Sequence, residues 1–114
     1  MTNKIIFNKK INSFNKKISV PGDKSLSIRW ILISSIANGI SKAKNLLMSE
    51  DIIATIDAIR KLGVKVKYND KTCVVYGNGI NGYRYKKKLI INAQNSGTLA
   101  RLIMGLLVDT PVPI

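Results

Sequence analysis

The sequence has no histidine and a single cysteine, Cys73, among its 114 residues. The chain therefore cannot close an internal disulfide, and it offers neither a Cys/His metal site nor a histidine general base. It also lacks a long apolar run. The longest one, residues 102–108, is far short of a membrane span, and the run near the amino terminus is too short for a signal peptide. These absences predict a cytoplasmic protein without a Cys/His metal site and without a membrane span.

Acidic residues are scarce as well, because six Asp and Glu stand against 19 Lys and Arg and leave a formal net charge of +13. Such a charge favours anionic partners, whether nucleic acid, an anionic membrane or a small phosphorylated molecule. Lysine supplies 15 of the 19 cations, and the chain is also rich in Ile and Asn, whose codons, like those of Lys, are AT-rich. Much of the charge is therefore expected to be solvated lysine that reflects genome composition.

The remaining composition, 46% hydrophobic and 22% charged residues, is that of a folded domain. Five short segments, some with alternating polar and apolar residues and others with a short apolar run, predict strands. These segments are residues 17–20, 40–47, 64–68, 72–76 and 88–92. The third and fourth flank the turn at Asn69-Asp70 and are expected to form a hairpin.

Three further segments carry apolar residues at helical spacing. The helices are expected to begin at Lys24, after Ser49 and after residues 95–98, and the first two to end at Asn38-Gly39 and at Gly63. Their predicted apolar faces are, in chain order, Leu26, Trp30, Ile33 and Ala37; Ile52, Ile56 and Ile59; and Leu99, Leu102, Ile103 and Leu106. The order β-α-β-α-β-β, followed by a further β-α, predicts an α/β fold.

The last six residues are Asp-Thr-Pro-Val-Pro-Ile, without the polar tail expected of a free, solvated terminus. We therefore expect the sequence to be part of a longer protein.

Two segments share one design, in which a predicted strand is followed by a glycine-containing turn and the start of a helix. Residues 21–29 read Pro-Gly-Asp-Lys-Ser-Leu-Ser-Ile-Arg, and residues 95–101 read Asn-Ser-Gly-Thr-Leu-Ala-Arg. Helix amino termini present unpaired backbone N–H groups and a partial positive charge, so each turn could hold a carboxylate or phosphate.

In the first turn Ser25 and Arg29 are four residues apart and share a helix face, and Lys24 stands at the start of that helix. The point charge of a lysine and the planar fork of an arginine could together orient two anionic groups. The alternative is purely structural. In that interpretation Asp23, Ser25 and Thr98 cap helices. Arg29 and Arg101 pair with backbone or acids.

The two motifs at this spacing, with the segment between them, resemble EPSP synthase, the 3-phosphoshikimate 1-carboxyvinyltransferase family. The resemblance covers roughly residues 17–107. It implies a transferase of aromatic amino acid biosynthesis that moves a carboxyvinyl group from phosphoenolpyruvate to the 5-hydroxyl of shikimate 3-phosphate. It implies no metal or organic cofactor, a monomeric enzyme, small-molecule substrates, and neither a nucleic-acid nor a membrane partner.

By the same resemblance, Lys24 contacts both substrates, Ser25 and Arg29 contact shikimate 3-phosphate, and the backbone of Gly97 contacts phosphoenolpyruvate. Many relatives have His at the position of Ile28 and Gly at the position of Gln94. Neither departure falls on a residue that contacts substrate.

The family fold has two lobes, each built from repeated β-α-β-α-β-β units. Residues 17–114 are expected to supply one unit and part of a second from one lobe, and residues 1–16, with a strand around Ile5, to belong to the other lobe. The family's acid–base carboxylates lie beyond residue 114, so no catalytic residue is expected in this chain and it should be inactive alone.

Two alternatives remain. The related enolpyruvyl transferase that acts on UDP-N-acetylglucosamine resembles this chain, but its first motif has Asn after the lysine, where this chain has Ser25. A basic nucleic-acid-binding module is suggested by residues 83–88, Tyr-Arg-Tyr-Lys-Lys-Lys, in which aromatic residues alternate with cations.

Overall fold

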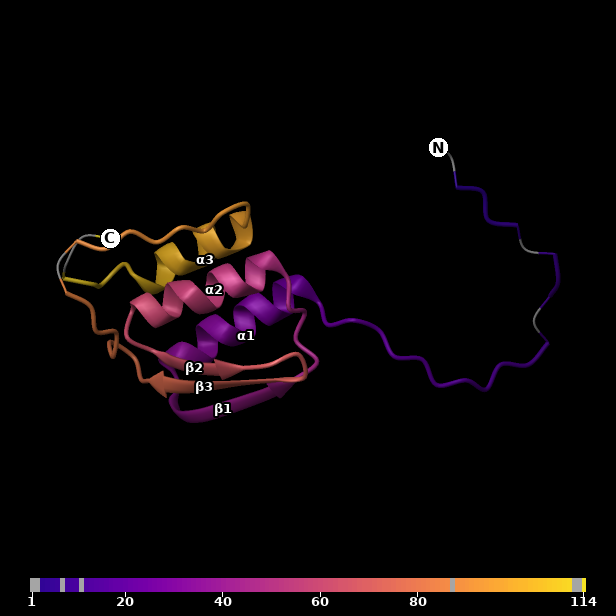
Figure 1. The fold of residues 1–114 in the computed structure, drawn as a ribbon, viewed down its shortest axis with the longest axis horizontal. Coiled ribbons are helices and arrows are strands. Elements are labelled where there is room, and N and C mark those ends of the chain that lie inside the picture. Colours follow the sequence, from indigo (N-terminus) through magenta and orange to yellow (C-terminus); the bar gives the residue numbers. More distant parts are fainter. Residues whose placement is uncertain (1–2, 7, 11, 87, 112–113) are drawn as a thin grey trace.

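The computed structural model describes residues 3–6, 8–10, 12–86, 88–111 and 114. In this part of the chain the elements are α1 (Lys24–Ile36), β1 (Asn38–Lys44), α2 (Glu50–Lys61), β2 (Lys65–Tyr68), β3 (Thr72–Asn78) and α3 (Gly97–Leu106). The helices lie on one side of the sheet, and most of the described residues ahead of the turn that leads into α1 extend away from both layers (Figure 1). This arrangement confirms the predicted α/β class.

The sheet has the strand order β1-β3-β2, and both pairings are antiparallel. On the central strand Val75 stands opposite Ser41 of β1 and Val66 of β2. Val75 and Val66 are buried beneath the helices, as is Cys73. The predicted hairpin is confirmed, and Asn69 closes its turn by accepting hydrogen bonds at Oδ1 from the backbone N–H groups of residues 71 and 72.

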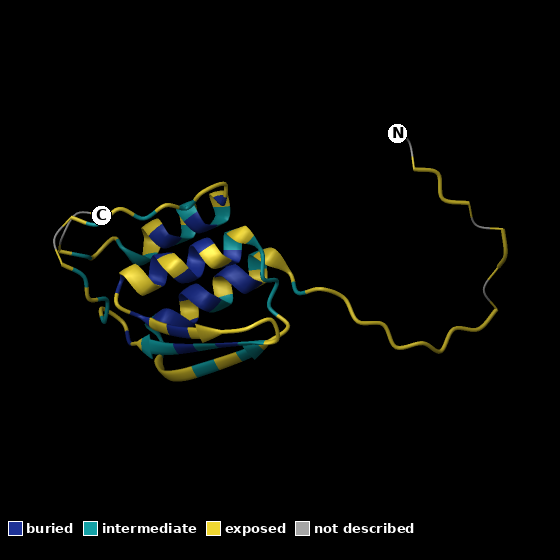
Figure 2. Ribbon diagram, in the orientation of Figure 1, coloured by how far each residue is buried: buried dark blue, intermediate teal, exposed yellow. Residues whose placement is uncertain are grey.

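The core is centred on α2, whose predicted face is confirmed because Ile52, Ile56 and Ile59 are all fully buried. Figure 2 shows this buried stripe facing the sheet and α1. The predicted end is also confirmed, since the helix stops at Lys61 and Gly63 adopts φ +87°, a conformation that favours glycine.

Helix α1 forms where predicted but buries a different face. Leu26 and Ile33, which share the predicted apolar stripe, are 67% and 63% exposed, whereas Ile28, Ile31 and Leu32 are buried in the core. The helix is apolar on nearly every side, so periodicity alone could not select the face that packs against α2 and β3.

Two predicted strands are absent. Residues 17–20 and 88–92 are not strands in the structure, and residues 17–20 belong to the segment that extends away from the body. A strand needs a neighbouring strand to pair with, and among the described residues neither segment is paired with one. Nor do Ile5 and Ile6 form the expected amino-terminal strand, while Phe7 lies outside the described residues.

Candidate anion-binding site

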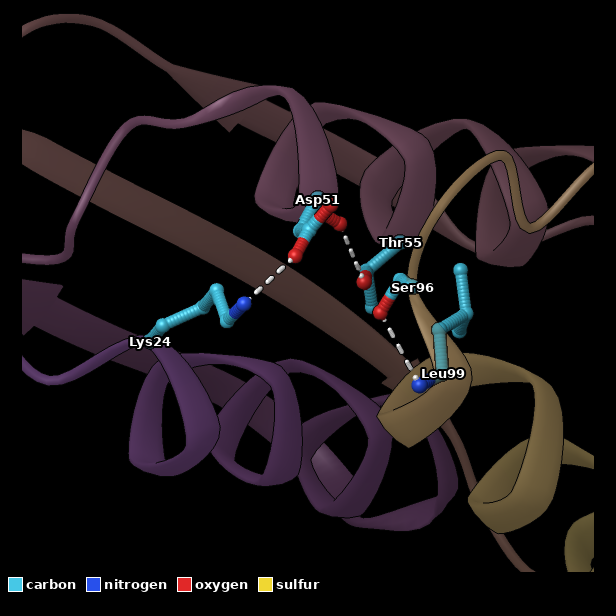
Figure 3. A network of polar contacts seen from close by, with 5 residues as sticks. All are labelled: Lys24, Asp51, Thr55, Ser96 and Leu99. Atoms are coloured by element: carbon cyan, nitrogen blue, oxygen red, sulfur yellow. Dashed lines mark hydrogen bonds and ion pairs between the residues drawn. The ribbon is translucent and has the colours of Figure 1, made fainter.

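The three helices run in the same direction, so their amino termini lie at one end of the molecule (Figure 1). Figure 3 brings these termini into one view, with Lys24 on α1, Asp51 on α2 and Ser96 before α3. Each helix start carries a partial positive charge and N–H groups without intrahelical partners. The fold therefore gathers the two predicted anion-binding turns beside the start of α2.

Side chains cap two of these helix starts. Asp23 accepts a hydrogen bond at Oδ1 from the Leu26 N–H at 2.7 Å, and Ser96 accepts one at Oγ from the Leu99 N–H at 3.1 Å. The purely structural alternative predicted that Asp23 and Thr98 cap helices. The prediction is confirmed for Asp23, but α3 is capped by Ser96 and not by Thr98. These caps leave the side chains of Lys24, Ser25 and Arg29 available for other contacts.

Lys24 reaches across from α1 to α2. Its Nζ lies 3.0 Å from Oδ2 of Asp51, and the Lys24 side chain is 52% exposed whereas that of Asp51 is 16% exposed. The Asp51 backbone carbonyl also accepts a hydrogen bond from the Thr55 hydroxyl at 2.8 Å (Figure 3). Lys24 is therefore held at the site by a carboxylate from the neighbouring helix.

Arg29 lies on the same helix as Lys24, but its guanidinium turns back towards the turn. Its Nη1 donates to the backbone carbonyl of Ser25 at 3.2 Å, at an exposed position. The structure thus confirms that Ser25 and Arg29 are neighbours on one helix face. A guanidinium has five N–H donors, so this single contact leaves capacity for an anionic ligand.

The second turn begins α3 at Gly97, where the guanidinium of Arg101 folds back over the backbone. A Cβ placed on Gly97 would stand 3.1 Å from Nη1 of Arg101. The helix start therefore combines a bare backbone with a nearby cation, a combination suited to a carboxylate or phosphate.

The first turn is fixed by contact with the segment between β1 and α2. Gly22 stands against the backbone of Asn45 and Leu47, so closely that a Cβ would collide with the Asn45 carbonyl oxygen. The Asn45 side-chain amide donates to the Val20 carbonyl at 3.3 Å, and the Leu47 N–H donates to the Ser27 hydroxyl at 3.3 Å. These contacts set where Lys24 begins its helix.

The two departures from the resembled motifs have structural explanations. Ile28 is fully buried and belongs to the hydrophobic core, so an apolar side chain is well accommodated there. Gln94 has φ +48°, in the left-handed region where glycine carries no steric penalty. A glycine at this position in relatives is consistent with that backbone conformation.

Sequence reasoning missed Asp51 and Ser27. It assigned Asp51 a role only in the first turn of α2, and it gave the hydroxyl of Ser27 no partner. Each residue makes a contact to a segment that is distant in the sequence, Asp51 to Lys24 and Ser27 to Leu47. No local pattern could have indicated them.

A sequence model of EPSP synthase (3-phosphoshikimate 1-carboxyvinyltransferase) matches residues 8–114. The chain belongs to the EPSP synthase family. It is 40% identical over 97 residues to the 3-phosphoshikimate 1-carboxyvinyltransferase of Bacillus cytotoxicus, covering 85% of this chain and 23% of the relative. It is 42% identical over 99 residues to that of Ruthia magnifica, covering 87% of this chain and 22% of the relative.

Solved structures of the EPSP synthase family show the same fold. The chain superposes on EPSP synthase from Acinetobacter baumannii with a TM-score of 0.73 and 35% identity, covering 81% of this chain and 21% of that structure. The chain thus spans between a fifth and a quarter of the length of these EPSP synthases.

Among the described residues, no helix has the length and apolar character needed to cross a membrane. That part of the chain also contains no group of three or more side chains suited to hold a metal ion.

Proposed function

We propose that this chain forms the part of an EPSP synthase that holds shikimate 3-phosphate and helps to hold phosphoenolpyruvate. The reaction would transfer a carboxyvinyl group from phosphoenolpyruvate to the 5-hydroxyl of shikimate 3-phosphate and release phosphate. The observation that carries the proposal is the gathering of both motif turns at one end of the helical layer, with Lys24 between α1 and α2. Both substrates are anionic, and helix starts with nearby cations suit such groups.

In this proposal each motif residue has a separate role. Lys24 supplies a positive charge to both substrates, and its pairing with Asp51 holds that charge at the end of the helical layer where the two motif turns meet. Ser25 and Arg29 bind shikimate 3-phosphate, the arginine through paired hydrogen bonds from its planar fork. Gly97 binds phosphoenolpyruvate through its backbone N–H at the start of α3, beside the Arg101 guanidinium.

We assign no acid–base step to the described residues. Asp51, the carboxylate closest to the motif lysine, is paired with that lysine and serves to position it. The chain covers under a quarter of its relatives' length, so the proton transfers would be made by the rest of such an enzyme. We further propose that the enzyme is a cytoplasmic monomer. Residues 17–114 would belong to one lobe, and residues 1–16 to the other.

The described side chains in residues 83–88 argue against the rival interpretation that this segment binds nucleic acid. Tyr83 is partly buried against the core, and its hydroxyl lies 2.7 Å from that of Ser35. Tyr85 also packs partly buried against the core. A stacking platform for bases needs exposed aromatic faces, so these two tyrosines are poorly placed to form one. Ser25, where the rival transferase has Asn, favours shikimate 3-phosphate over UDP-N-acetylglucosamine.

A chimaeric enzyme tests the proposal. Residues 8–114 of this chain, which match the family model, would replace the corresponding segment of the Bacillus cytotoxicus enzyme, with which 97 residues of this chain align. We expect the chimaera to release phosphate from phosphoenolpyruvate only when shikimate 3-phosphate is present, and the 114-residue chain alone to release none above background. A folded chimaera that neither binds shikimate 3-phosphate nor turns over would contradict the proposal.

A further inference from the structure

Ser27 is a polar residue buried inside the first motif, with only 2% of its surface exposed. Capping does not account for it, because Asp23 already caps α1 through its side chain. Burying a hydroxyl is unfavourable unless it forms hydrogen bonds, so its partners indicate what the residue does.

The Ser27 hydroxyl joins the two segments that form the site. It donates to the Asp23 carbonyl at 2.6 Å and accepts a hydrogen bond from the Leu47 N–H at 3.3 Å. Asp23 immediately precedes Lys24, whereas Leu47 lies in the connection between β1 and α2. One buried hydroxyl therefore links the turn that presents Lys24 to the segment that leads into α2.

The path from Leu47 to Asp51 is short and made of backbone hydrogen bonds. The Leu47 carbonyl accepts from the Ser49 N–H at 2.9 Å, and the Ser49 carbonyl accepts from the Ile52 N–H at 3.1 Å. Asp51 lies within this first turn of α2. A shift of Leu47 relative to α1 would therefore be passed to the carboxylate that holds Lys24.

We propose that Ser27 is a positioning residue that sets the geometry of the Lys24–Asp51 pair. This inference rests on the proposed function for its effect on substrate, but its structural part can be tested without substrate. Alanine at position 27 leaves the Leu47 N–H without its acceptor and releases the turn from the β1–α2 connection. Lys24 then samples more orientations, and the site loses preorganisation.

Ser35 provides a matched control on the same helix. It is fully buried, and its hydroxyl donates to the Leu32 carbonyl at 2.6 Å and lies 2.7 Å from the Tyr83 hydroxyl, remote from the motif turn. Ser27→Ala and Ser35→Ala should both lower the melting temperature, since each removes a buried hydroxyl with two partners. Their effects on the site should differ.

The substrate-free test is amide hydrogen exchange on the 114-residue chain. Followed by NMR, Ser27→Ala should abolish exchange protection at the Leu47 N–H and shift the side-chain resonances of Lys24 and Asp51. Ser35→Ala should change neither. If Leu47 protection and these signals are the same in wild type and Ser27→Ala, Ser27 does not position the pair. This measurement stands even if the chimaera fails to bind shikimate 3-phosphate and the proposed function falls.

The functional test is a double-mutant cycle in the chimaeric enzyme. Ser27→Ala should lower kcat/KM by about tenfold, in the range for loss of preorganisation, whereas Ser35→Ala should leave it within about twofold once folded protein is counted. In an Asp51→Asn background the additional effect of Ser27→Ala should shrink to less than about twofold, because the pair that Ser27 positions is already lost. Equal losses in both backgrounds, or equal losses from the two serine variants, would overturn the proposal.

Discussion

The ammonium of Lys24 and the carboxylate of Asp51 join the amino termini of α1 and α2 at a distance of 3.0 Å. The lysine is half exposed, so solvent screens the pair and its contribution to stability is small. Its value lies in holding a flexible side chain where an anionic substrate would need a positive charge. Under the proposed function, the pair therefore serves to position Lys24 for substrate and contributes little to the stability of the fold.

Replacing Asp51 by Asn tests this distinction. Asp51→Asn should lower the free energy of unfolding of the 114-residue chain by only about 1 kcal/mol, from loss of a screened pair and of a charge at a helix start. In the chimaeric enzyme the same change should lower kcat/KM by about tenfold, because Lys24 is no longer held in place. Urea unfolding and phosphate release measure the two effects. A large loss of stability with unchanged kcat/KM would show that the pair is structural.

Replacing Arg29 by Lys keeps the charge but removes the planar fork. If Arg29 binds shikimate 3-phosphate through paired hydrogen bonds, calorimetry on the chimaera should show affinity reduced by about 1.5–3 kcal/mol, roughly tenfold or more. The melting temperature should stay unchanged, because Arg29 is exposed. Arg84→Lys is the matched control, since the guanidinium of Arg84 also donates to backbone carbonyls but lies outside the motifs. Wild-type affinity in the Arg29 variant would remove Arg29 from the site.

Replacing Gly22 by Ala tests whether the first turn depends on close backbone approach. A Cβ at Gly22 would meet the Asn45 carbonyl oxygen and the Leu47 nitrogen, so Gly22→Ala should destabilise the chain by about 2 kcal/mol or more. Gly105→Ala is the control, because a Cβ at that helical position meets nothing and should stabilise the chain by about 0.5–1 kcal/mol. Equal effects in chemical denaturation would mean that the turn can move away from Asn45 without cost.

Burial raises the pKa of the Cys73 thiol above its usual value of 9.0, and the nearby Arg60 charge offsets only part of this rise. The folded chain then holds the thiol proton more tightly than the unfolded chain. The resulting stabilisation is fully present below the unfolded pKa and is lost as the pH rises through the folded one.

The free energy of unfolding should therefore fall more for the wild type than for Cys73→Ala as the pH rises through and above the usual thiol pKa of 9.0. Comparing the two proteins at each pH removes the contribution of titrating lysines and the constant effect of the cavity left by alanine. A difference between them that does not vary with pH would show that the thiol ionises equally in both states.

Local sequence patterns predicted the elements that carry clear boundary signals. Helix α2 has acids in its first turn, cations in its last and a glycine beyond its end, and it was located with its correct buried face. The two motif turns were likewise identified as helix starts. Helix α1 was located, but Leu26 and Ile33 were assigned to the core because nothing in a helix that is apolar all round distinguishes the inner face.

Features that depend on contacts between distant segments could not be predicted. Residues 17–20 alternate as strands do and residues 88–92 form a short apolar run, yet a strand forms only where a neighbouring strand accepts its hydrogen bonds. The pairing of Lys24 with Asp51 and the link from Ser27 to Leu47 both arise from the packing of the β1–α2 connection on α1. The sequence therefore predicted which residues form the candidate site, while the structure was needed to show the contacts that hold Lys24 in place.

The most direct test of the account is the rate of phosphate release by the chimaeric enzyme when Lys24 is replaced by Ala, compared with the same change at Lys16. Lys16 is an exposed cation outside the motifs and the secondary structure, so its loss controls for general charge. Lys24→Ala should cost roughly 2–4 kcal/mol of transition-state stabilisation, on the order of 10²–10³-fold in kcat/KM, whereas Lys16→Ala should be nearly silent. Equal losses at the two positions would show that overall positive charge, and not the motif turn, serves the reaction.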